Sequence, residues 1–387
     1  MPAWRRPRIK GSPPALPTPT RRHKGAGTVA RGGLESGDFG AQGGDPRRRA
    51  GGIRLDLSTC VNRYGPPPAA RAVLSGLDGQ DLQIHPYAAV DQVAAAYAAL
   101  LDVDVDQLVA GRGTTEFIWA FGRQVPHDTV AVPLPAYTDY LKAFPGRGFA
   151  GSDPSAIPTL ALVDEAMRRA GFVILSNPHN PSGVCLSRDG LLAVAAANPR
   201  CTLVVDESYV DFLLEPDSAT VAGRAGDNVI VLRSPSKFYG IAATRAGVAW
   251  CRDRDRLDHL LGPRETWPIS GLDAALAVSS LESVAWAHRS RRQLAEDGGW
   301  LAAELRRRDF DVVEEDVGVH YRCVLTEEPD LLARGFAREG IGVRPLGAAH
   351  GVRPGAVRIL APLRTERVPV EDALEAVAAT GVLASCG

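Results

Sequence analysis

Residues 202–209 of the chain read Thr-Leu-Val-Val-Asp-Glu-Ser-Tyr. The run 202–205 is short, apolar and β-branched, which is typical of a strand buried in the middle of a sheet. It ends at Asp206, so such a strand would carry a carboxylate at its carboxyl end. Taken alone, Asp206 is equally compatible with a turn residue or a helix N-cap. Its role therefore depends on the segments around this strand.

Similar apolar runs alternate with helical stretches along the chain. Further strands are predicted at 129–133, 172–176, 229–233 and 246–250. Helices are predicted at 90–101, 115–124 and 188–197, with Ser187 as the N-cap of the last one. This alternation predicts an α/β fold in which helices cover a mostly parallel sheet. In such folds the ligand binds at the carboxyl ends of the strands.

Beyond residue 267 the pattern becomes that of a smaller α+β domain. Helices are predicted at 272–308, 330–339 and 370–379, and strands near 311–314, 320–325, 343 and 357–360. We therefore divide the chain into a basic tail at 1–52, an N-terminal arm at 53–80, a large ligand-binding domain at 81–266 and a small C-terminal domain at 267–387.

The composition excludes several classes of protein. The 387 residues are 45% hydrophobic and 23% charged, which is the profile of a globular protein. The tail is rich in Arg, Pro, Gly and Ser, and we expect it to be disordered because it can bury little apolar surface. No apolar run approaches the ~20 residues of a membrane helix, and no secretory signal is evident. We expect a cytoplasmic protein without membrane contact and, since the six cysteines are scattered, without a metal site.

Lysine is rare in this chain, and one lysine stands at a predicted strand end. Only four lysines occur against forty arginines, and Lys237 lies in Ser234-Pro-Ser-Lys-Phe-Tyr-Gly240, directly after the strand at 229–233. Arginine cannot replace a lysine that must lose its proton and act as an amine nucleophile. The alternative is an ordinary surface lysine.

Three further segments place polar groups at the same predicted edge. Asn180 lies in the turn at 176–183, which follows the strand at 172–176. Gly113 lies in the glycine-rich start of a helix, where free backbone N–H groups can bind an anion. Arg245 follows Lys237 by eight residues, and its guanidinium could hold phosphate oxygens. Each of these signals is common by itself.

The order of these residues resembles the fold type I pyridoxal-phosphate enzymes, namely the class I and II aminotransferases. The resemblance extends from about Leu55 to about Ala379 and is greatest to the histidinol-phosphate aminotransferase and threonine-phosphate decarboxylase branch. It is carried by residues in this order: Gly113, Thr114, Thr115, Tyr137, Asn180, Asp206, Tyr209, Ser234, Ser236, Lys237, Arg245 and Arg358.

The resemblance implies a role for each residue that would contact the ring of pyridoxal 5'-phosphate. Lys237 would form the internal aldimine and then move the α-proton of the substrate. Asp206 would keep the ring nitrogen protonated, so that the ring accepts the electrons of the α-carbanion. Asn180 and Tyr209 would donate hydrogen bonds to the phenolic oxygen, and Tyr137 would stack on the ring face.

The resemblance also implies phosphate and substrate contacts. The phosphate would be bound by Gly113, Thr114, Thr115, Ser234, Ser236 and Arg245. Arg358 would bind the α-carboxylate of the substrate, beside Asn180. Tyr64 would reach the cofactor phosphate of a neighbouring subunit, which implies a homodimer.

Some positions depart from the family pattern and leave the substrate open. Arg63 stands where proline is common and Arg112 where asparagine is common, and each would either add positive charge near the site or face solvent. Thr115 stands where an acid is frequent, and Pro235 interrupts the loop before Lys237. His85 and His320 are candidates for further site residues or for ordinary core or surface histidines.

The predicted function is that of a pyridoxal-phosphate-dependent aminotransferase acting on an amino acid. The alternative is elimination, replacement, cyclisation or decarboxylation, because the same lysine and ring serve all of these reactions. A regulator that uses such a domain with a DNA-binding segment would need a folded module in the tail, which shows no helical periodicity. We therefore expect no nucleic-acid partner.

Overall fold

The computed structural model describes residues 52–79, 81–152, 157–313, 318–347, 350–351 and 355–380. Nearly all of the predicted basic tail, part of the strand predicted near 311–314 and the last seven residues lie outside the described residues. Within the described ranges, no helix is long and apolar enough to cross a membrane, and no group of three metal-binding side chains occurs.

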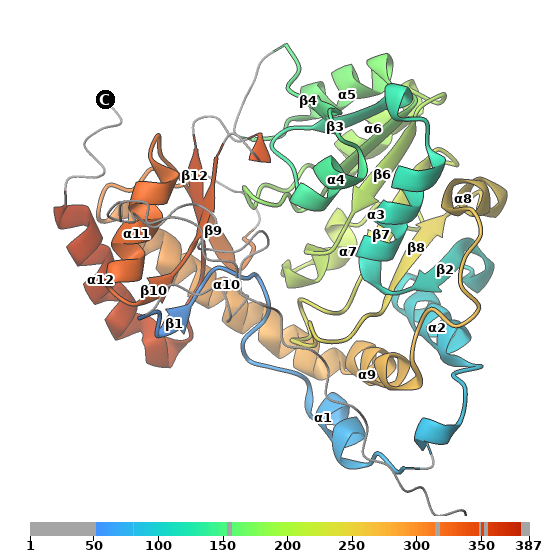
Figure 1. Ribbon diagram of the computed structural model, residues 1–387, viewed down its shortest axis with the longest axis horizontal. Coiled ribbons are helices and arrows are strands. Elements are labelled where there is room, and N and C mark those ends of the chain that lie inside the picture. The colour runs from blue at the N-terminus through green and yellow to red at the C-terminus, as the bar shows by residue number, and fades with distance from the viewer. Residues whose placement is uncertain are drawn as a thin grey trace, which may run out of the picture. The chain divides into compact units, whose positions relative to one another are not determined.

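The central sheet has seven strands in the order β2-β8-β7-β6-β5-β3-β4 (Figure 1). The strands are β2 (Leu108–Gly111), β3 (Val130–Pro133), β4 (Gly148–Phe149), β5 (Phe172–Ser176), β6 (Thr202–Asp206), β7 (Val229–Arg233) and β8 (Gly247–Cys251). Neighbours from β4 to β7 are parallel, whereas β8 is antiparallel to both β7 and β2. The prediction of a mostly parallel sheet is confirmed.

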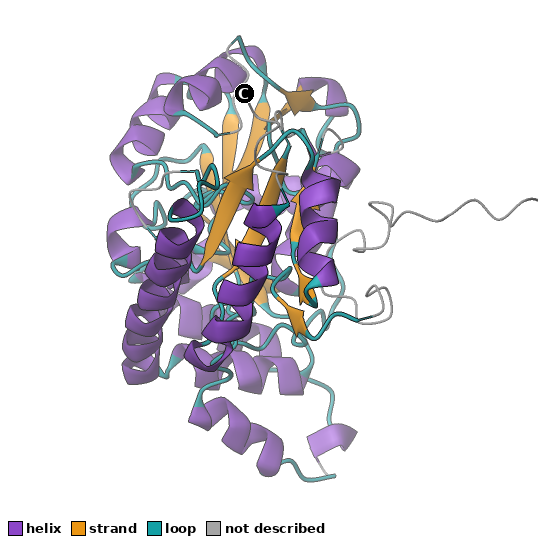
Figure 2. Ribbon diagram, turned by 90° about the vertical axis from the view of Figure 1, so that its left-hand side faces the viewer, coloured by secondary structure: helices purple, strands orange, loops and turns teal. Residues whose placement is uncertain are grey.

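Helices cover both faces of this sheet (Figure 2). Alternate residues of β6 belong to two different cores: Leu203 and Val205 pack in one, and Val204 packs in the other. This is the side-chain alternation of a strand that is buried on both faces. One face carries α2 (Ala89–Leu101), α5 (Leu160–Arg169) and α6 (Arg188–Ala197); the other carries α3 (Gly113–Gln124), α4 (Thr138–Ala143) and α8 (Arg254–Leu261).

The predicted helix start at Ser187 is found in the structure. The Ser187 hydroxyl accepts a hydrogen bond from the backbone N–H of Gly190 and so satisfies one free donor of the first turn of α6. The strands β5, β6 and β7 have the predicted bounds, whereas β8 begins and ends one residue later than predicted. The short strands β2 and β4, of four and two residues, were not predicted.

A second, antiparallel sheet has the order β11-β12-β9, from β9 (Tyr321–Leu325), β11 (Arg344–Leu346) and β12 (Ala356–Leu360). The helices of this region are α10 (Val284–Arg306), α11 (Pro329–Arg338) and α12 (Arg367–Ala379). The helical region predicted at 272–308 is found as two helices, because α9 (Gly271–Leu281) ends before α10 begins. At the break the Ser283 hydroxyl donates to the Ser279 carbonyl, a local bond that competes with regular helix.

The segment before α1 (Pro68–Ser75) contacts both the C-terminal region and the loop that follows β7 of the large sheet. Its strand β1 (Leu55–Asp56) pairs in parallel with β10 (Ile341–Gly342), and Figure 1 shows β1 in blue beside the red strands. A few residues later, the backbone N–H of Asn62 donates to the carbonyl of Lys237, with an N–O distance of 2.9 Å. The remaining helix is the short α7 (Pro216–Ala219). The N-terminal segment is therefore fixed beside the predicted catalytic loop.

Candidate active site

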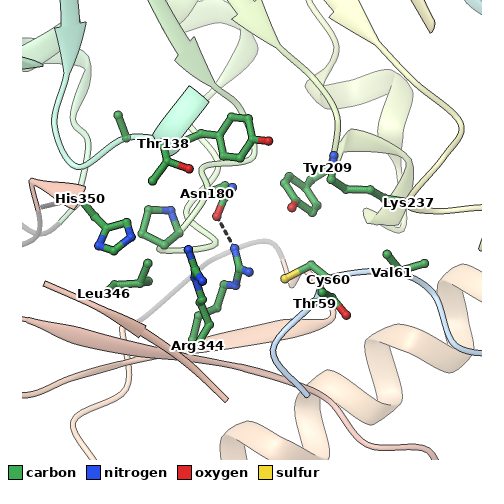
Figure 3. Close-up of a pocket in the computed structure, with 14 residues that line it drawn as sticks. Thr59, Cys60, Val61, Thr138, Asn180, Tyr209, Lys237, Arg344, Leu346 and His350 are labelled. Atoms are coloured by element: carbon green, nitrogen blue, oxygen red, sulfur yellow. Dashed lines mark hydrogen bonds between the residues drawn. The ribbon is translucent and has the colours of Figure 1, made fainter. Parts of the chain in front are cut away.

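A cavity of about 170 Å³ lies where the strand ends of the large sheet face the antiparallel sheet (Figure 3). Five of the predicted site residues line it: Tyr137, Asn180, Tyr209, Lys237 and Arg358. The other lining residues were not predicted: Thr59, Cys60, Val61, Ala136, Thr138, Pro181, Arg344, Leu346 and His350. Most of them come from loops or from β11, and Thr138 begins α4.

Lys237 follows β7, and its side chain reaches into this cavity. Its ammonium nitrogen lies 5.2 Å from the centre of the Tyr209 ring. Burial lowers the pKa of Lys237 below its usual value; Asp206 opposes this shift, and the positive charges of Arg245 and Arg358 add to it. The lysine can therefore lose its proton more readily than an exposed one, as a nucleophile requires.

Asp206 ends β6 and is buried, with its carboxylate held by three donors. The Ser208 backbone N–H and hydroxyl donate to Oδ1 at 3.0 and 2.5 Å, and the Tyr140 hydroxyl donates to Oδ2 at 2.7 Å. Neither Ser208 nor Tyr140 was predicted as a site residue. Ser208 lay inside the quoted strand-end motif, but Tyr140 is 66 residues away from Asp206.

Asn180 and Arg358 meet across the cavity. Arg358 donates from Nη1 to the Asn180 side-chain oxygen and from Nη2 to the Ser58 carbonyl, and Figure 3 draws the first bond as a dashed line. These two bonds join β12, the loop after β5 and the N-terminal segment. The Nε of Arg358 has no hydrogen-bond partner among the described residues. Three separate parts of the chain thus converge on one guanidinium.

Arg344 is the direct cross-strand partner of Arg358 in the β11–β12 ladder. Both side chains are largely buried, although like charges directly opposite each other destabilise a sheet. Burial, and next to it the charge of Arg358, lowers the pKa of Arg344 to about 10. The pocket therefore has two neighbouring guanidiniums that an anionic ligand would stabilise.

His350 lies at the same end of the cavity. Burial, followed by the charges of Arg344 and Arg358, lowers its pKa to about 4, so the ring is neutral at pH 7. Its Nδ1 accepts the backbone N–H of Gly347, and its own carbonyl accepts the N–H of Ala136. Because the imidazole is neutral, it can lie beside Arg344 and Arg358 without charge repulsion.

The residues predicted to bind the phosphate form a second group, none of which lines the cavity. The helix α3 begins at Gly113, where an added Cβ would lie 3.1 Å from Arg245 Nη2. The Ser234 hydroxyl donates to the Ala246 carbonyl, next to Arg245, and its oxygen lies 3.0 Å from the Ser236 hydroxyl oxygen. The Thr114 hydroxyl lies 3.5 Å from that of Ser208, which links this group to Asp206. Thr115 follows in the first turn of α3.

Tyr137 precedes α4, and its position is set by neighbours on both sides. Its ring meets that of Tyr140 edge to face, with the centroids 5.4 Å apart. The carbonyl of Pro135 accepts a hydrogen bond from His179, whose other ring nitrogen is bonded to Ser182. Burial lowers the pKa of His179 to about 4, so this buried imidazole stays neutral. No role was predicted for His179. Its two ring hydrogen bonds join the loop that carries Tyr137 to the loop that carries Asn180.

Several residues whose position was left open have partners away from the cavity. Arg63 forms two 2.5 Å hydrogen bonds with Glu366, and Arg112 pairs with Glu265 at 3.0 Å. The ring of His85 stacks on Trp267, and that of His320 stacks on Phe212. Neither Tyr64 nor any of these four residues lines the cavity. The Tyr64 hydroxyl instead donates to Asp297 within the same chain, at 2.5 Å.

Comparison with known proteins agrees with this geometry. The family model for aminotransferases of class I and II matches residues 53–377. Histidinol-phosphate aminotransferase 1 of Bordetella parapertussis is 30% identical over 269 residues, which cover 67% of this chain and 74% of that protein. The corresponding protein of Bradyrhizobium diazoefficiens is 28% identical over 264 residues, covering 67% of this chain and 75% of the relative.

Solved structures share the fold. Histidinol-phosphate aminotransferase from Sinorhizobium meliloti, in complex with pyridoxal-5'-phosphate, has a TM-score of 0.71 at 20% identity and covers 85% of this chain and 92% of its own. L-threonine-O-3-phosphate decarboxylase from Porphyromonas gingivalis has a TM-score of 0.68 at 19% identity, covering 83% of this chain and 98% of its own. The predicted fold type I architecture is confirmed.

The contact between β8 and the start of α3 leads to a testable prediction. A Cβ at Gly247 would lie 2.7 Å from the Arg233 carbonyl oxygen and 2.9 Å from Gly113 Cα, so Gly247→Ala must displace the start of α3. We expect this variant to bind pyridoxal phosphate at least about tenfold more weakly, as measured by equilibrium dialysis.

The matched control is Gly271→Ala, since a Cβ at Gly271 has no atom within 4 Å apart from its chain neighbours and the backbone of its own helix turn. This variant should bind the cofactor like the wild type. Equal affinities of the two variants would show that the start of α3 does not hold the phosphate.

Proposed function

Because the chain belongs to the class I and II aminotransferase family and is a pyridoxal-phosphate-dependent aminotransferase, we propose that its substrate carries a second anionic group, a phosphate or a carboxylate. The observation that carries this proposal is the pair Arg344 and Arg358, which face each other across β11 and β12 and both line the cavity. One guanidinium suffices for an α-carboxylate. The guanidinium of Arg344 adds a second positive charge to the same cavity, where an anionic group on the substrate's side chain would contact it.

The free-energy cost of burying two like charges supports this proposal. Removing a charge from water is expensive unless a partner of opposite sign accompanies it. Arg358 is bonded here to neutral oxygens of Asn180 and Ser58, which carry no compensating charge. An anion with several acceptor oxygens could accept hydrogen bonds from both guanidiniums. The names of the histidinol-phosphate aminotransferase relatives agree with a phosphate ester as one such ligand.

The residues present fit the family's cofactor. The N–H groups at the start of α3, the guanidinium of Arg245 and the hydroxyl of Ser236 form a donor set suited to a phosphate, and the Ser234 hydroxyl lies 3.0 Å from that of Ser236. Glycine at position 113 keeps the space beside Arg245 open, because an added Cβ would lie 3.1 Å from Nη2. We propose that these groups, with Thr114 and Thr115, hold the phosphate of the cofactor.

We assign the remaining contacts by the same reasoning. Asp206 would face the ring nitrogen, Asn180 and Tyr209 would donate to the phenolic oxygen, and Tyr137 would cover one face of the ring. When bound, the cofactor supplies an electron-accepting ring that stabilises negative charge at the substrate's α-carbon. Lys237 would remove the α-proton and return it at the adjacent cofactor carbon. Burial lowers the pKa of Lys237, which favours the neutral amine needed for this step.

Replacing Lys237 by arginine tests its role as nucleophile and base. Lys237→Arg keeps the positive charge but cannot lose its proton, so we expect amino-group transfer to fall by at least about a thousandfold. Borohydride treatment should then no longer fix the cofactor covalently to the protein, as measured by mass spectrometry.

The control for this experiment is Lys142→Arg. Lys142 is about half exposed, pairs with Asp139 at 3.4 Å and should tolerate arginine without loss of activity. If Lys237→Arg retained turnover and a borohydride-fixed cofactor, the assignment of Lys237 would be wrong.

Product analysis separates transamination from the alternative reactions. The purified protein is incubated with a panel of amino donors, with and without a keto-acid acceptor. Transamination yields one keto acid for each aminated acceptor. Release of ammonia, carbon dioxide or a side-chain leaving group without an aminated acceptor would instead support elimination, replacement, cyclisation or decarboxylation.

The two arginines predict a selective change in substrate affinity. Arg344→Gln should raise the KM for donors with a phosphate or carboxylate side chain by about ten- to a hundredfold, since a charge-assisted hydrogen bond is lost. The KM for donors with an apolar side chain should change little. Arg358→Gln, by contrast, should raise the KM for every donor that has an α-carboxylate.

Steady-state kinetics on matched pairs of donors checks this prediction. An equal rise of KM for charged and apolar donors in Arg344→Gln would contradict a side-chain site at Arg344.

We further propose that two copies form a homodimer through the surface around α1 and the start of α2. Leu82, Ile84 and Tyr87 are 77%, 68% and 70% exposed there and line a cavity of about 800 Å³. Exposed apolar surface of this extent is typical of protein interfaces. The predicted contact of Tyr64 with a partner's cofactor would require Tyr64 to leave Asp297, to which it is bonded in this chain.

A charged substitution in this surface tests the dimer. Ile84→Asp should raise the dimer dissociation constant at least about tenfold, as measured by sedimentation velocity. Val368→Asp, at a residue of α12 that is 67% exposed, is the matched control and should leave it unchanged. A monomeric wild type, or a dimer insensitive to Ile84→Asp, would contradict this interface.

Three other predictions stay open. These are the division into an arm at 53–80, a large domain at 81–266 and a small domain at 267–387, the cytoplasmic location, and the absence of a nucleic-acid partner.

A further inference from the structure

The carboxylate of Asp206 has four acceptor positions, two on each oxygen. The Ser208 backbone N–H and hydroxyl occupy Oδ1, at 3.0 and 2.5 Å. The Tyr140 hydroxyl occupies one position on Oδ2, at 2.7 Å. The bonds found in the described part of the chain thus leave one position of Oδ2 for a ligand. The direction of that position depends on where Tyr140 holds the oxygen.

Tyr140 itself is held rigidly. It lies in α4 and is 1% exposed, in the core that contains Phe121, Phe144 and Phe172. Its backbone N–H donates to the Tyr137 carbonyl, and its own carbonyl accepts the N–H of Phe144. A side chain packed in this way has little rotamer freedom.

Tyr140 contacts two of the residues assigned to the cofactor ring. Its hydroxyl binds Asp206, and its ring meets Tyr137 edge to face, with an interplanar angle of 86°. Asp206 lies at the end of β6 and Tyr137 lies in the loop after β3, so no regular hydrogen bond of the sheet connects them. Tyr140 is a single rigid group between them.

We propose that Tyr140 is the positioning residue that sets the carboxylate of Asp206 and the ring of Tyr137 relative to each other, so that both meet one planar cofactor ring. This inference rests on the proposed assignment of Asp206 and Tyr137 to the cofactor. The hydroxyl must stay a donor for this purpose. Burial, and then the negative charge of Asp206, raises the pKa of Tyr140 well above its usual value, so the phenol keeps its proton at neutral pH.

The variant that isolates the hydroxyl is Tyr140→Phe, which keeps the ring contact with Tyr137 and removes the bond to Asp206. We expect the affinity for pyridoxal phosphate to fall about tenfold, because a hydrogen bond to a charged group is lost. The absorbance spectrum of the bound cofactor and its pH dependence should shift, since Asp206 is no longer held in one orientation. The KM for the amino donor should change little, because donor contacts are assigned to Arg358 and Asn180.

The chain offers a matched control in Tyr97→Phe. Tyr97 is also fully buried, but its hydroxyl has no hydrogen-bond partner in the described part of the chain. This variant should leave cofactor affinity and spectrum unchanged. Urea unfolding of both variants shows whether any loss follows from a general loss of stability.

A second variant restores the donor. The ring N–H of histidine can donate to the same carboxylate, so Tyr140→His should recover part of the spectrum and affinity lost in Tyr140→Phe. This comparison also keeps the test decisive if Tyr140→Phe is less stable than the wild type.

The outcomes separate this inference from the proposed function. A tenfold loss of cofactor affinity with a shifted spectrum in Tyr140→Phe, absent in Tyr97→Phe and partly reversed in Tyr140→His, supports it. If Tyr140→Phe binds the cofactor with wild-type affinity and spectrum, or if Tyr97→Phe shows the same loss, the inference is wrong. If the wild type itself takes up no pyridoxal phosphate, the proposed cofactor assignments are wrong as well.

Discussion

The arrangement of the site depends on one buried guanidinium. Arg233 ends β7 and pairs with Glu207 at 3.1 Å and with Asp211 at 2.7 Å, and all three side chains are almost fully buried. Glu207 directly follows Asp206, Asp211 lies two residues after Tyr209, and Arg233 precedes the loop of Lys237. Removing one partner of a buried pair typically costs about 3–5 kcal/mol, because an uncompensated charge remains. This ion cluster therefore fixes the loops after β6 and β7 against each other.

Electrostatics divides the site into two parts. Around Asp206, hydrogen-bond donors surround a carboxylate at the end of the parallel strands. Across the cavity, Arg344 and Arg358 supply positive charge from the antiparallel sheet. Lys237 lines the same cavity as the two arginines, and burial lowers its pKa although Asp206 opposes this shift. Under the proposed assignments, Asp206 would face the cationic ring of the cofactor and the two arginines would bind the anionic groups of the substrate.

Much of the fold could be predicted because its central strands are buried on both faces. The uninterrupted apolar runs of β5, β6 and β7 marked their bounds correctly, and Ser187 marked the start of α6. The division of the predicted helical region into α9 and α10 could not be located from the sequence, since no proline or glycine interrupts the helical pattern at residues 282–283. The antiparallel direction of β8 was also missed, because an apolar run has the same pattern in either direction.

The amino-acid sequence by itself determined which reactive groups follow the strands: a lysine after one strand, an acid at the end of another and a glycine-rich helix start. These are local features, since strand ends and helix starts are encoded within a few residues. Only the tertiary structure decided which groups meet. Tyr140 reaches Asp206 across 66 residues, and Arg344 faces Arg358 through strand register. Such contacts depend on the order and packing of the strands, which hydrophobic periodicity along the chain does not specify.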